Sequence, residues 1–212
     1  MSDAELSPAA TTADAAATPA RKRPKPGERR VQILQALAMM LEQPGAERIT
    51  TAALAARLEV SEAALYRHFA SKAQMFEGLI DFIEQSVFTL INQITDRSAP
   101  GQEQAARIIA MLVQFAEKNP GMTRVMVGDA LVYENERLQN RMNQFFDKIE
   151  ATLRQVLRGA AAADGSATPS VDAQVRAAAL TAFVVGQLQR FARSGFRRAP
   201  SEHLEATIAL IV

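Results

Sequence analysis

Apolar residues in the first half of the chain recur at intervals of three and four, which is the period of an amphipathic helix. This spacing predicts a first helix over residues 28–42 and a longer, fourth helix over about residues 72–95. Between them, Thr50 or Thr51 and then Ser61 stand where helix N-caps are expected. The pattern therefore predicts two further short helices, the second and third of the chain.

Prolines and glycines divide the second half of the chain into helical segments, because neither residue suits a helix interior. Such breaks occur at residues 100–101, 120–121 and 165–169. The apolar spacing between them predicts a fifth helix around residues 108–115 and a long amphipathic helix around residues 138–157. We therefore expect an all-helical fold.

An eighth helix, predicted over about residues 171–194, has apolar side chains that point in several directions, so we expect it to be buried on nearly all sides. Ala178, Ala182 and Gly186 place small side chains at every fourth position, which lets another helix approach to the short end of the usual range of about 8–10 Å. With Phe183 they form the predicted dimer interface. Tight packing within one subunit is the alternative explanation.

Composition narrows the class of protein. The chain has 212 residues, of which 48% are hydrophobic and 6% aromatic, and this favours helices that pack through aliphatic side chains. It has no cysteine and two histidines, so we expect neither a metal site nor a cofactor. The sequence contains no apolar run of membrane-spanning length and no signal-peptide pattern. We expect a cytoplasmic protein that does not associate with membranes.

Charge is unevenly placed along the chain. The formal net charge is +1, but residues 21–30 carry six basic side chains against one glutamate. Residues 1–20 contain too few apolar side chains to offset the entropy of ordering, so we expect them to be disordered. The basic arm over residues 21–27 is interpreted either as a solvated linker or as a segment that lies along DNA phosphates.

The segment RITTAALAARLEVSEAALYRHFASK, residues 48–72, indicates a helix-turn-helix between Thr50 and Phe69 with its turn at residues 58–60. A short recognition helix can enter the major groove if the side chains near its start are small. Ser61, Ala63 and Ala64 meet this requirement. Because alanines read little beyond thymine methyl groups, sequence preference is expected to come partly from Thr50 and Thr51 and from groove shape.

Polar side chains follow the small ones. Tyr66, Arg67 and His68 can all reach phosphate oxygens that flank the groove. Lys72 follows Ser71, which forms a predicted capping box with Gln74 at the start of the fourth helix, where a positive helix dipole favours a phosphate. The predicted DNA-binding residues are Thr50, Thr51, Ser61, Ala63, Ala64, Tyr66, Arg67, His68 and Lys72.

The segment ITTAALAARLEVSEAALYRHFASKAQMF resembles the DNA-binding domain of TetR-type regulators, whose signature is an aromatic, a basic pair and Phe before Ser-Lys. The resemblance implies a homodimer with about nine helices per subunit, in which helices eight and nine form a four-helix bundle across the two-fold axis. We expect a tail and arm over residues 1–27, a DNA-binding domain over 28–88, and a dimerisation and partner-binding domain over 89–212. Glu59 departs from the family, which usually has glycine there, and a left-handed non-glycine residue costs roughly 1 kcal/mol.

A narrower resemblance extends over roughly residues 28–200, through RRVQILQALAMMLE, LIDFIEQS, EKNPGMTRVMVGDALVYENERLQNRMNQFFDKIEATLRQVLR and RFARSGFRRAP. These segments are similar to TetR-type nucleoid-occlusion factors, which bind DNA and, when bound, block polymerisation of the division protein FtsZ. The resemblance implies a nucleoid-associated protein. It also implies that a groove between helices four and five, near Phe82, Lys118 and Asn119, faces FtsZ.

Other functions find less support in the sequence. An enzyme is not indicated, since there is no phosphate-binding glycine loop, no nucleophile and base pair, and no metal-ligand spacing. The one carboxylate cluster, Asp129, Glu134 and Glu136, is interpreted as a solvated face or a partner-facing patch. A ligand-responsive repressor is the main alternative, but the almost purely aliphatic inward stripes favour a filled core. A purely architectural DNA protein would have no protein partner.

Overall fold

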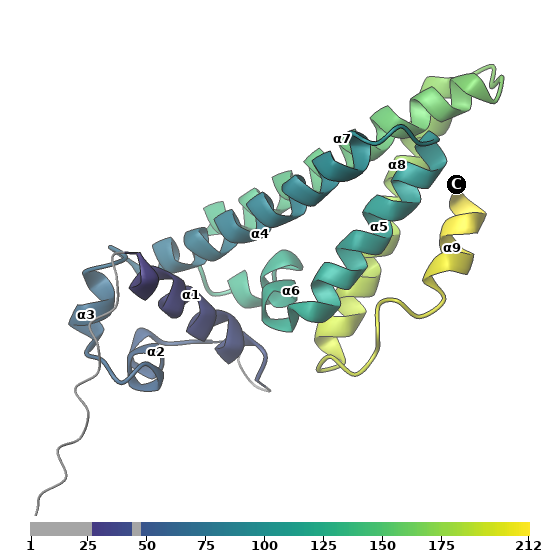
Figure 1. The fold of residues 1–212 in the computed structure, drawn as a ribbon. Coiled ribbons are helices and arrows are strands. Elements are labelled where there is room, and N and C mark those ends of the chain that lie inside the picture. The colour runs from purple at the N-terminus through teal and green to yellow at the C-terminus, as the bar shows by residue number, and fades with distance from the viewer. Residues whose placement is uncertain (1–26, 44–47) are drawn as a thin grey trace, which may run out of the picture.

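The computed structural model describes residues 27–43 and 48–212, and every regular element within these ranges is a helix (Figure 1). The all-helical prediction is confirmed. The predictions for residues 1–26 lie outside the described residues. In chain order the elements are α1 (Glu28–Leu41), α2 (Thr51–Arg57), α3 (Glu62–Tyr66), α4 (Lys72–Thr95), α5 (Gly101–Lys118), α6 (Pro120–Met126), the 3-10 helix η1 (Asp129–Leu131), α7 (Glu136–Ala163), α8 (Pro169–Arg193) and α9 (Leu204–Ile211).

Three side-chain caps fix where α2, α3 and α4 begin. The hydroxyl oxygens of Thr50, Ser61 and Ser71 each accept a hydrogen bond from the backbone N–H three residues later, at 3.1–3.2 Å, as the sequence predicted. The capping box at α4 differs from its expected form. The side chain of Gln74 accepts from the N–H of Ala70 at 2.8 Å, one residue before the cap, so Gln74 secures the chain that enters the helix.

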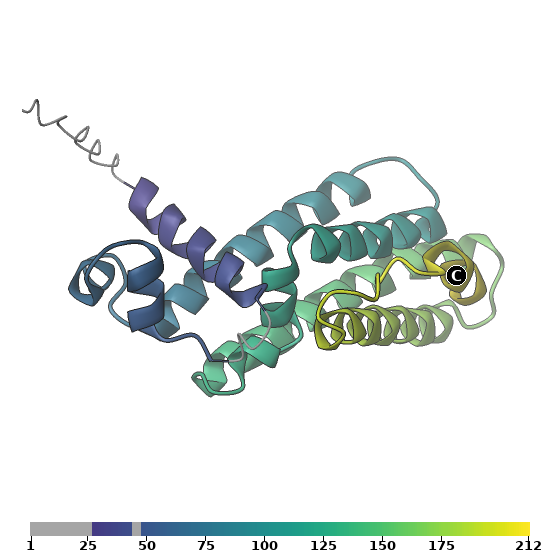
Figure 2. The same ribbon diagram turned by 90° about the horizontal axis from the view of Figure 1, so that it is seen from below.

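The long helix α4 connects a small head, formed by α1, α2 and α3, to a bundle formed by α4, α5, α7 and α8. Figure 1 shows α4 leaving the head and running beside α7, and Figure 2 shows the bundle helices side by side. Its buried stripe continues through both parts, because apolar side chains recur at intervals of three and four. The buried residues of α4 are Met75, Phe76, Leu79, Ile80, Ile83, Val87 and Ile91.

The head and the bundle also meet through α1 and α6, whose backbones are in close contact. A Cβ atom on Gly121 would lie 2.0 Å from the carbonyl oxygen of Ala38, which is far inside van der Waals contact. Glycine is therefore required at residue 121. Pro120 begins α6 at a position where its missing N–H has no intrahelical partner to lose.

Helix α8 is buried along one face only in the single chain. That face carries Ala173, Ala177, Leu180, Val184, Leu188, Phe191 and Ala192. The opposite face leaves Val171 60% and Val175 62% exposed. The expectation of burial on nearly all sides is therefore not met within one subunit, because no helix in the described ranges covers this second face.

Glu59 adopts a left-handed backbone conformation, although the TetR-type regulators that the sequence resembles usually have glycine at this position. Its φ is 53°, and it closes α2 through a Schellman motif in which Val60 N–H donates to Ala55 O at 3.0 Å and Glu59 N–H donates to Ala56 O at 3.1 Å. The same motif ends α7 and α8, where glycine takes the left-handed position: Gly165 has φ 78° and Gly195 has φ 63°. The turn of the helix-turn-helix therefore forms, with a residue less suited to its backbone.

We expect Glu59→Gly to be more stable than Glu59→Ala. Both variants lose the same carboxylate, but only glycine escapes the cost of a left-handed backbone, roughly 1–2 kcal/mol. The greater freedom of glycine in the unfolded chain offsets about 0.4–1 kcal/mol of this gain. Thermal unfolding should show a Tm roughly 1–4 °C higher for the glycine variant. Equal Tm values would mean that the strain at residue 59 is no larger than the entropic cost of glycine, about 0.4–1 kcal/mol, and a lower Tm for the glycine variant would contradict the expectation.

Candidate nucleic-acid interface

The two helices of the helix-turn-helix are held together by a small apolar core and one polar contact. Leu54, Leu65 and Phe69 are each 1% exposed and pack into the main core. The hydroxyl of Thr51 donates to the carboxylate of Glu62 at 2.5 Å, which joins the first turn of α2 to the first turn of α3. The apolar core and this hydrogen bond together hold α2 and α3 at a fixed angle.

The small residues at the start of α3 are accessible, as a groove-facing role requires. Ser61 and Ala63 are exposed and Ala64 is half-buried. Thr50 is also exposed, although its hydroxyl oxygen caps α2. Thr51 differs from the expectation, since it is half-buried and its hydroxyl hydrogen is committed to Glu62. Its contribution to the site is the placement of α3 rather than a free hydroxyl.

The polar residues after α3 form the outer edge of the candidate interface. Tyr66 is 45% exposed, Arg67 is exposed and His68 is half-buried. Arg30, on α1, donates to the backbone carbonyl of His68, and its guanidinium lies 4.1 Å from the ring centroid of Phe69. Sequence reasoning placed Arg30 in a general basic stretch and missed this contact, which fixes the end of the recognition helix against α1.

Lys72 begins α4 as predicted, but it has a partner within the chain. Its ammonium forms an ion pair with the carboxylate of Glu134, in the segment between η1 and α7, and lies 5.8 Å from the ring centroid of Phe76. The two charged side chains are 26% and 10% exposed, respectively. Glu134, which the sequence analysis assigned to a solvated or partner-facing patch, is thus a neighbour of the predicted phosphate site.

Further ion pairs join α4 to α7 beyond Lys72. Arg137 pairs with Glu77 at 2.6 Å, and Arg141 pairs with both Asp81 and Glu84 at 2.6 Å. The hydrogen bond to Glu84 is the largest influence on the pKa of Arg141 and raises it above its usual range, while burial opposes the shift. Arg141 therefore stays charged, and the pairs fix the rotation of α4 against α7.

The residues predicted to face a protein partner lie on α4 and at the end of α5. Phe82 is 49% exposed, which is a large apolar side chain in contact with solvent. Lys118 is exposed at the last position of α5. Asn119 is half-buried, and its side-chain amide donates to the carbonyl of Phe115 at 2.7 Å, so it shapes the end of α5 more than it presents a free group.

The predicted dimer residues divide between two faces of α8. Ala178 and Gly186 are half-buried and Ala182 is exposed, and a Cβ atom on Gly186 would meet no atom of the chain within 4 Å. Phe183 instead packs against the main core. The small residues of the outward face continue an accessible apolar stripe that sequence reasoning had not assigned. The stripe, at alternating intervals of four and three residues as in a coiled-coil seam, consists of Val171, Val175, Ala178, Ala182 and Val185.

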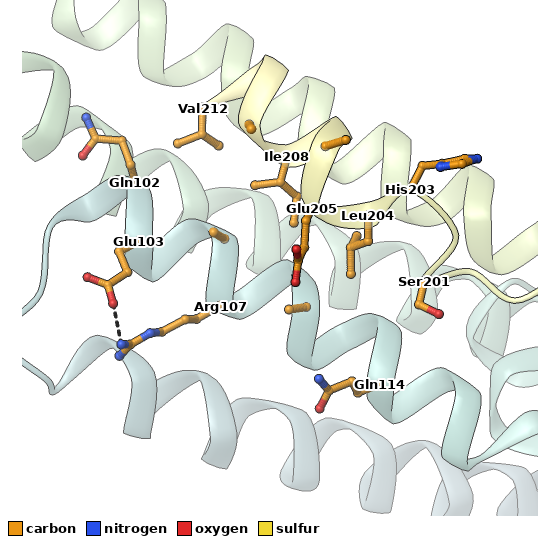
Figure 3. A pocket seen from close by; sticks show the side chains of 14 residues that line it. Gln102, Glu103, Arg107, Gln114, Ser201, His203, Leu204, Glu205, Ile208 and Val212 are labelled. Carbon is orange, nitrogen blue, oxygen red and sulfur yellow. Dashed lines mark hydrogen bonds and ion pairs between the residues drawn. The ribbon is translucent and has the colours of Figure 1, made fainter.

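A groove of about 960 Å³ lies between α5 and α9. Figure 3 shows Glu103 and Arg107 facing each other on α5, with Leu204 and Ile208 of α9 on the other side. Glu103 and Arg107 form an ion pair, so the charges nearest to one another in this groove are already matched. None of the α4 residues that are buried in the core lines this groove.

No helix in residues 27–43 and 48–212 is long and apolar enough to cross a membrane. Among the same residues, no group of three or more His, Asp or Glu side chains is arranged to hold a metal ion.

Comparison with protein families divides the chain into two matching regions. The family described as bacterial regulatory proteins, tetR family, matches residues 33–79. The SlmA-like family described as tetracyclin repressor-like, C-terminal domain, matches residues 103–212. The first match includes the helix-turn-helix, and the second includes α7, α8 and α9.

Solved structures of low sequence identity share the fold. A TetR family transcriptional regulator, PfmR from Thermus thermophilus, has a TM-score of 0.69 with 23% identity and covers 85% of this chain and 96% of its own. The regulator FadR from Bacillus subtilis, solved in complex with stearoyl-CoA, has a TM-score of 0.67 with 14% identity and covers 86% of this chain and 97% of its own. These likenesses establish the fold.

Relatives of much higher identity extend over nearly the whole described chain. The nucleoid occlusion factor SlmA of Vibrio vulnificus is 51% identical over 188 residues, which is 88% of this chain and 95% of that protein. The nucleoid occlusion factor SlmA of Photobacterium profundum is 52% identical over 182 residues, 85% of this chain and 92% of that protein. The chain therefore belongs to the SlmA family of nucleoid occlusion factors, which carry a TetR-type DNA-binding domain.

Proposed function

We propose that this nucleoid occlusion factor binds palindromic DNA as a dimer and, while bound, antagonises FtsZ polymerisation so that division septa do not form over the chromosome. The observation that carries the proposal is the identity of about one half to nucleoid occlusion factors over 85–88% of the chain. That identity includes the bundle, where the SlmA-like family matches residues 103–212. In this role the protein is associated with the nucleoid.

The DNA side of the proposal is supported by the accessible residues of the head. Ser61 and Ala63 are exposed at the start of α3, where small side chains let a helix enter the major groove. Tyr66 and Arg67 are exposed at its end and are proposed to hold phosphates on either side. These contacts position the protein, while base preference comes from the groove-facing residues and from DNA shape.

The dimer side is supported by the outward stripe of α8. Val171 and Val175 are more than half exposed in the single chain, and contiguous exposed apolar surface of this kind marks interaction sites. The small side chains of Ala178, Ala182 and Gly186 would let the same helix of a second subunit approach closely. A two-fold contact between the stripes then places two recognition helices on one DNA duplex, which is why a palindromic site is proposed.

The partner side is proposed to involve Phe82 on α4 and Lys118 at the end of α5. An exposed phenylalanine and an exposed lysine would suit a partner segment that is both apolar and acidic, because the phenylalanine would bury apolar surface and the lysine would pair with a negative charge. Asn119 contributes by capping the end of α5 through its bond to Phe115.

A ligand-responsive repressor is supported less well by the core. Thr123 is the one buried polar residue in the described part of the chain, and its hydroxyl is hydrogen-bonded to the carbonyls of Ala116, at 2.9 Å, and Asn119, at 3.1 Å. A small-molecule site usually presents several convergent polar groups in a cavity. The other buried side chains in the described part are apolar, and the hydroxyl of Thr181 is the one buried side-chain polar group there without a hydrogen-bond partner. A single such group supports a surface partner rather than a core effector.

We expect the purified protein to reduce the amount of FtsZ polymer that sediments with GTP, and to do so more strongly when a palindromic DNA duplex is present. Phe82→Ala should weaken this inhibition at least about fivefold without changing DNA affinity, since burying a phenylalanine is worth about 1.5–3 kcal/mol. Leu90→Ala, at an exposed position two turns further along α4, is the matched control. Inhibition that is the same with and without DNA would contradict the proposal.

Lys72→Ala is expected to weaken binding to every DNA sequence by a similar factor. A lysine that neutralises one phosphate adds about one released counterion, so the slope of log K against log salt should fall by about one. Fluorescence anisotropy with a palindromic and a scrambled duplex at several salt concentrations measures both quantities. A loss confined to the palindrome would mean that Lys72 reads bases and does not hold phosphate.

Val175→Glu is expected to raise the dimer dissociation constant at least about tenfold, because it brings two like charges to the two-fold contact and removes apolar surface. Val31→Glu introduces the same change at another valine that is 54% exposed, on α1, and should leave the dimer intact. Sedimentation-velocity measurements over a dilution series give both constants. Equal dissociation constants for the two variants would remove α8 from the interface.

A further inference from the structure

The ion pair between Lys72 and Glu134 joins a predicted DNA-binding residue at the start of α4 to the segment between η1 and α7. Lys72 is the first residue of α4, directly after the Ser71 cap, and Glu134 lies between η1 and α7, 62 positions later in the chain. The side chain of Glu134 is 10% exposed, and that of Lys72 is 26% exposed. The lysine is therefore the partner that an external anion can reach.

This pair has the opposite polarity to the other ion pairs between α4 and the α7 region. Further along α4, acidic residues on α4 face arginines on α7, as in Glu77 with Arg137 and Glu84 with Arg141. At the DNA end the cation is on α4 and the carboxylate comes from the other side. DNA adds negative charge. At the start of α4 a phosphate can therefore compete with Glu134 for the cation of Lys72. The α4 members of the other pairs are carboxylates, which do not attract a phosphate.

A phosphate and the carboxylate of Glu134 would compete for the ammonium of Lys72. Both are anions, and bringing them to the same cation places two like charges within a few ångströms of each other. Glu134 is the more buried partner, so leaving it without a cation has a desolvation cost. Repulsion between the two anions would therefore favour movement of Glu134 toward solvent when a phosphate binds at Lys72.

We infer that Glu134 competes with DNA phosphate for Lys72, so that it lowers DNA affinity and is released when DNA binds. This inference rests on the phosphate role proposed above for Lys72. The segment that carries Glu134 also carries Val132 and Tyr133, which are 69% and 68% exposed. Release of the ion pair would free this segment of the partner-binding half when the head is on DNA, which gives DNA binding a direct effect outside the head.

Glu134→Gln is expected to bind DNA of any sequence roughly three to ten times more tightly than the parent protein, because a part-buried ion pair no longer has to be broken. Anisotropy titrations with a palindromic and a scrambled duplex at fixed salt measure the change. Glu136→Gln removes the same charge two residues away at an exposed position and should change affinity much less. An equal gain in both variants, or a loss in Glu134→Gln, would overturn the competition.

A double variant separates the competition from the phosphate role itself. In a Lys72→Gln background, which can still hydrogen-bond residue 134, the Glu134→Gln change should no longer affect affinity. If Lys72→Gln alone leaves DNA binding unchanged, the phosphate role fails and the competition fails with it. If Lys72→Gln weakens binding but Glu134→Gln changes nothing, the phosphate role stands and the competition is wrong. Matching Tm values for the variants confirm that folding is not the cause.

Hydrogen exchange gives a readout that does not depend on affinity. The amide of Glu134 donates to the carbonyl of Leu131 at 3.0 Å in this structure, and we expect it to exchange at least about threefold faster when the parent protein is bound to DNA. In Glu134→Gln the ion pair is absent, so adding DNA should change the exchange rate of this amide much less. A slower or unchanged rate in the parent protein on DNA would contradict the release of this segment.

Discussion

The continuity of α4 is the constraint on which the rest of the structure depends. One unbroken helix supplies Phe76 to the core of the head and Val87 and Ile91 to the core of the bundle, and all three are no more than 1% exposed. Because the helix has no proline or glycine beyond Gly78, it transmits position rigidly from one end to the other. Any change in how its first turn is held must therefore be compatible with the packing of its later turns, or it must be taken up by the segments that contact it.

Local physical chemistry was sufficient to predict most of the secondary structure. The caps at Thr50, Ser61 and Ser71 and the length of α4 follow from residues within four positions of one another, which is the range over which helix signals act. The left-handed turn at Glu59 was expected only from the resemblance to TetR-type regulators, which usually have glycine there, and the structure shows that glutamate adopts the same conformation. These features depend on neighbours in sequence, so one sequence contains the information that specifies them.

Contacts between distant residues could not be predicted in the same way. The pairing of Lys72 with Glu134, and the contact of Arg30 with the carbonyl of His68, depend on how helices pack and leave no periodic signal. Helix α8 shows the converse case. Its apolar pattern predicted burial on nearly all sides, but the single chain leaves Val175 exposed, and the surface proposed to cover that face belongs to a second subunit.

The head is attached to the bundle by contacts of two different kinds, and the difference matters for how DNA binding can be sensed. Where α1 meets α6, Gly121 lies against the backbone at Ala38, and a steric contact of this kind resists movement whatever the charge of the surroundings. The contact of Lys72 with Glu134 is electrostatic, so a phosphate can weaken it without disturbing the apolar core. The steric contact of α1 with α6 would keep the head in its orientation on DNA, while the segment around Glu134 moves when the ion pair is weakened. If both contacts were steric, DNA binding would not affect the bundle. If both were electrostatic, the head would have no fixed orientation.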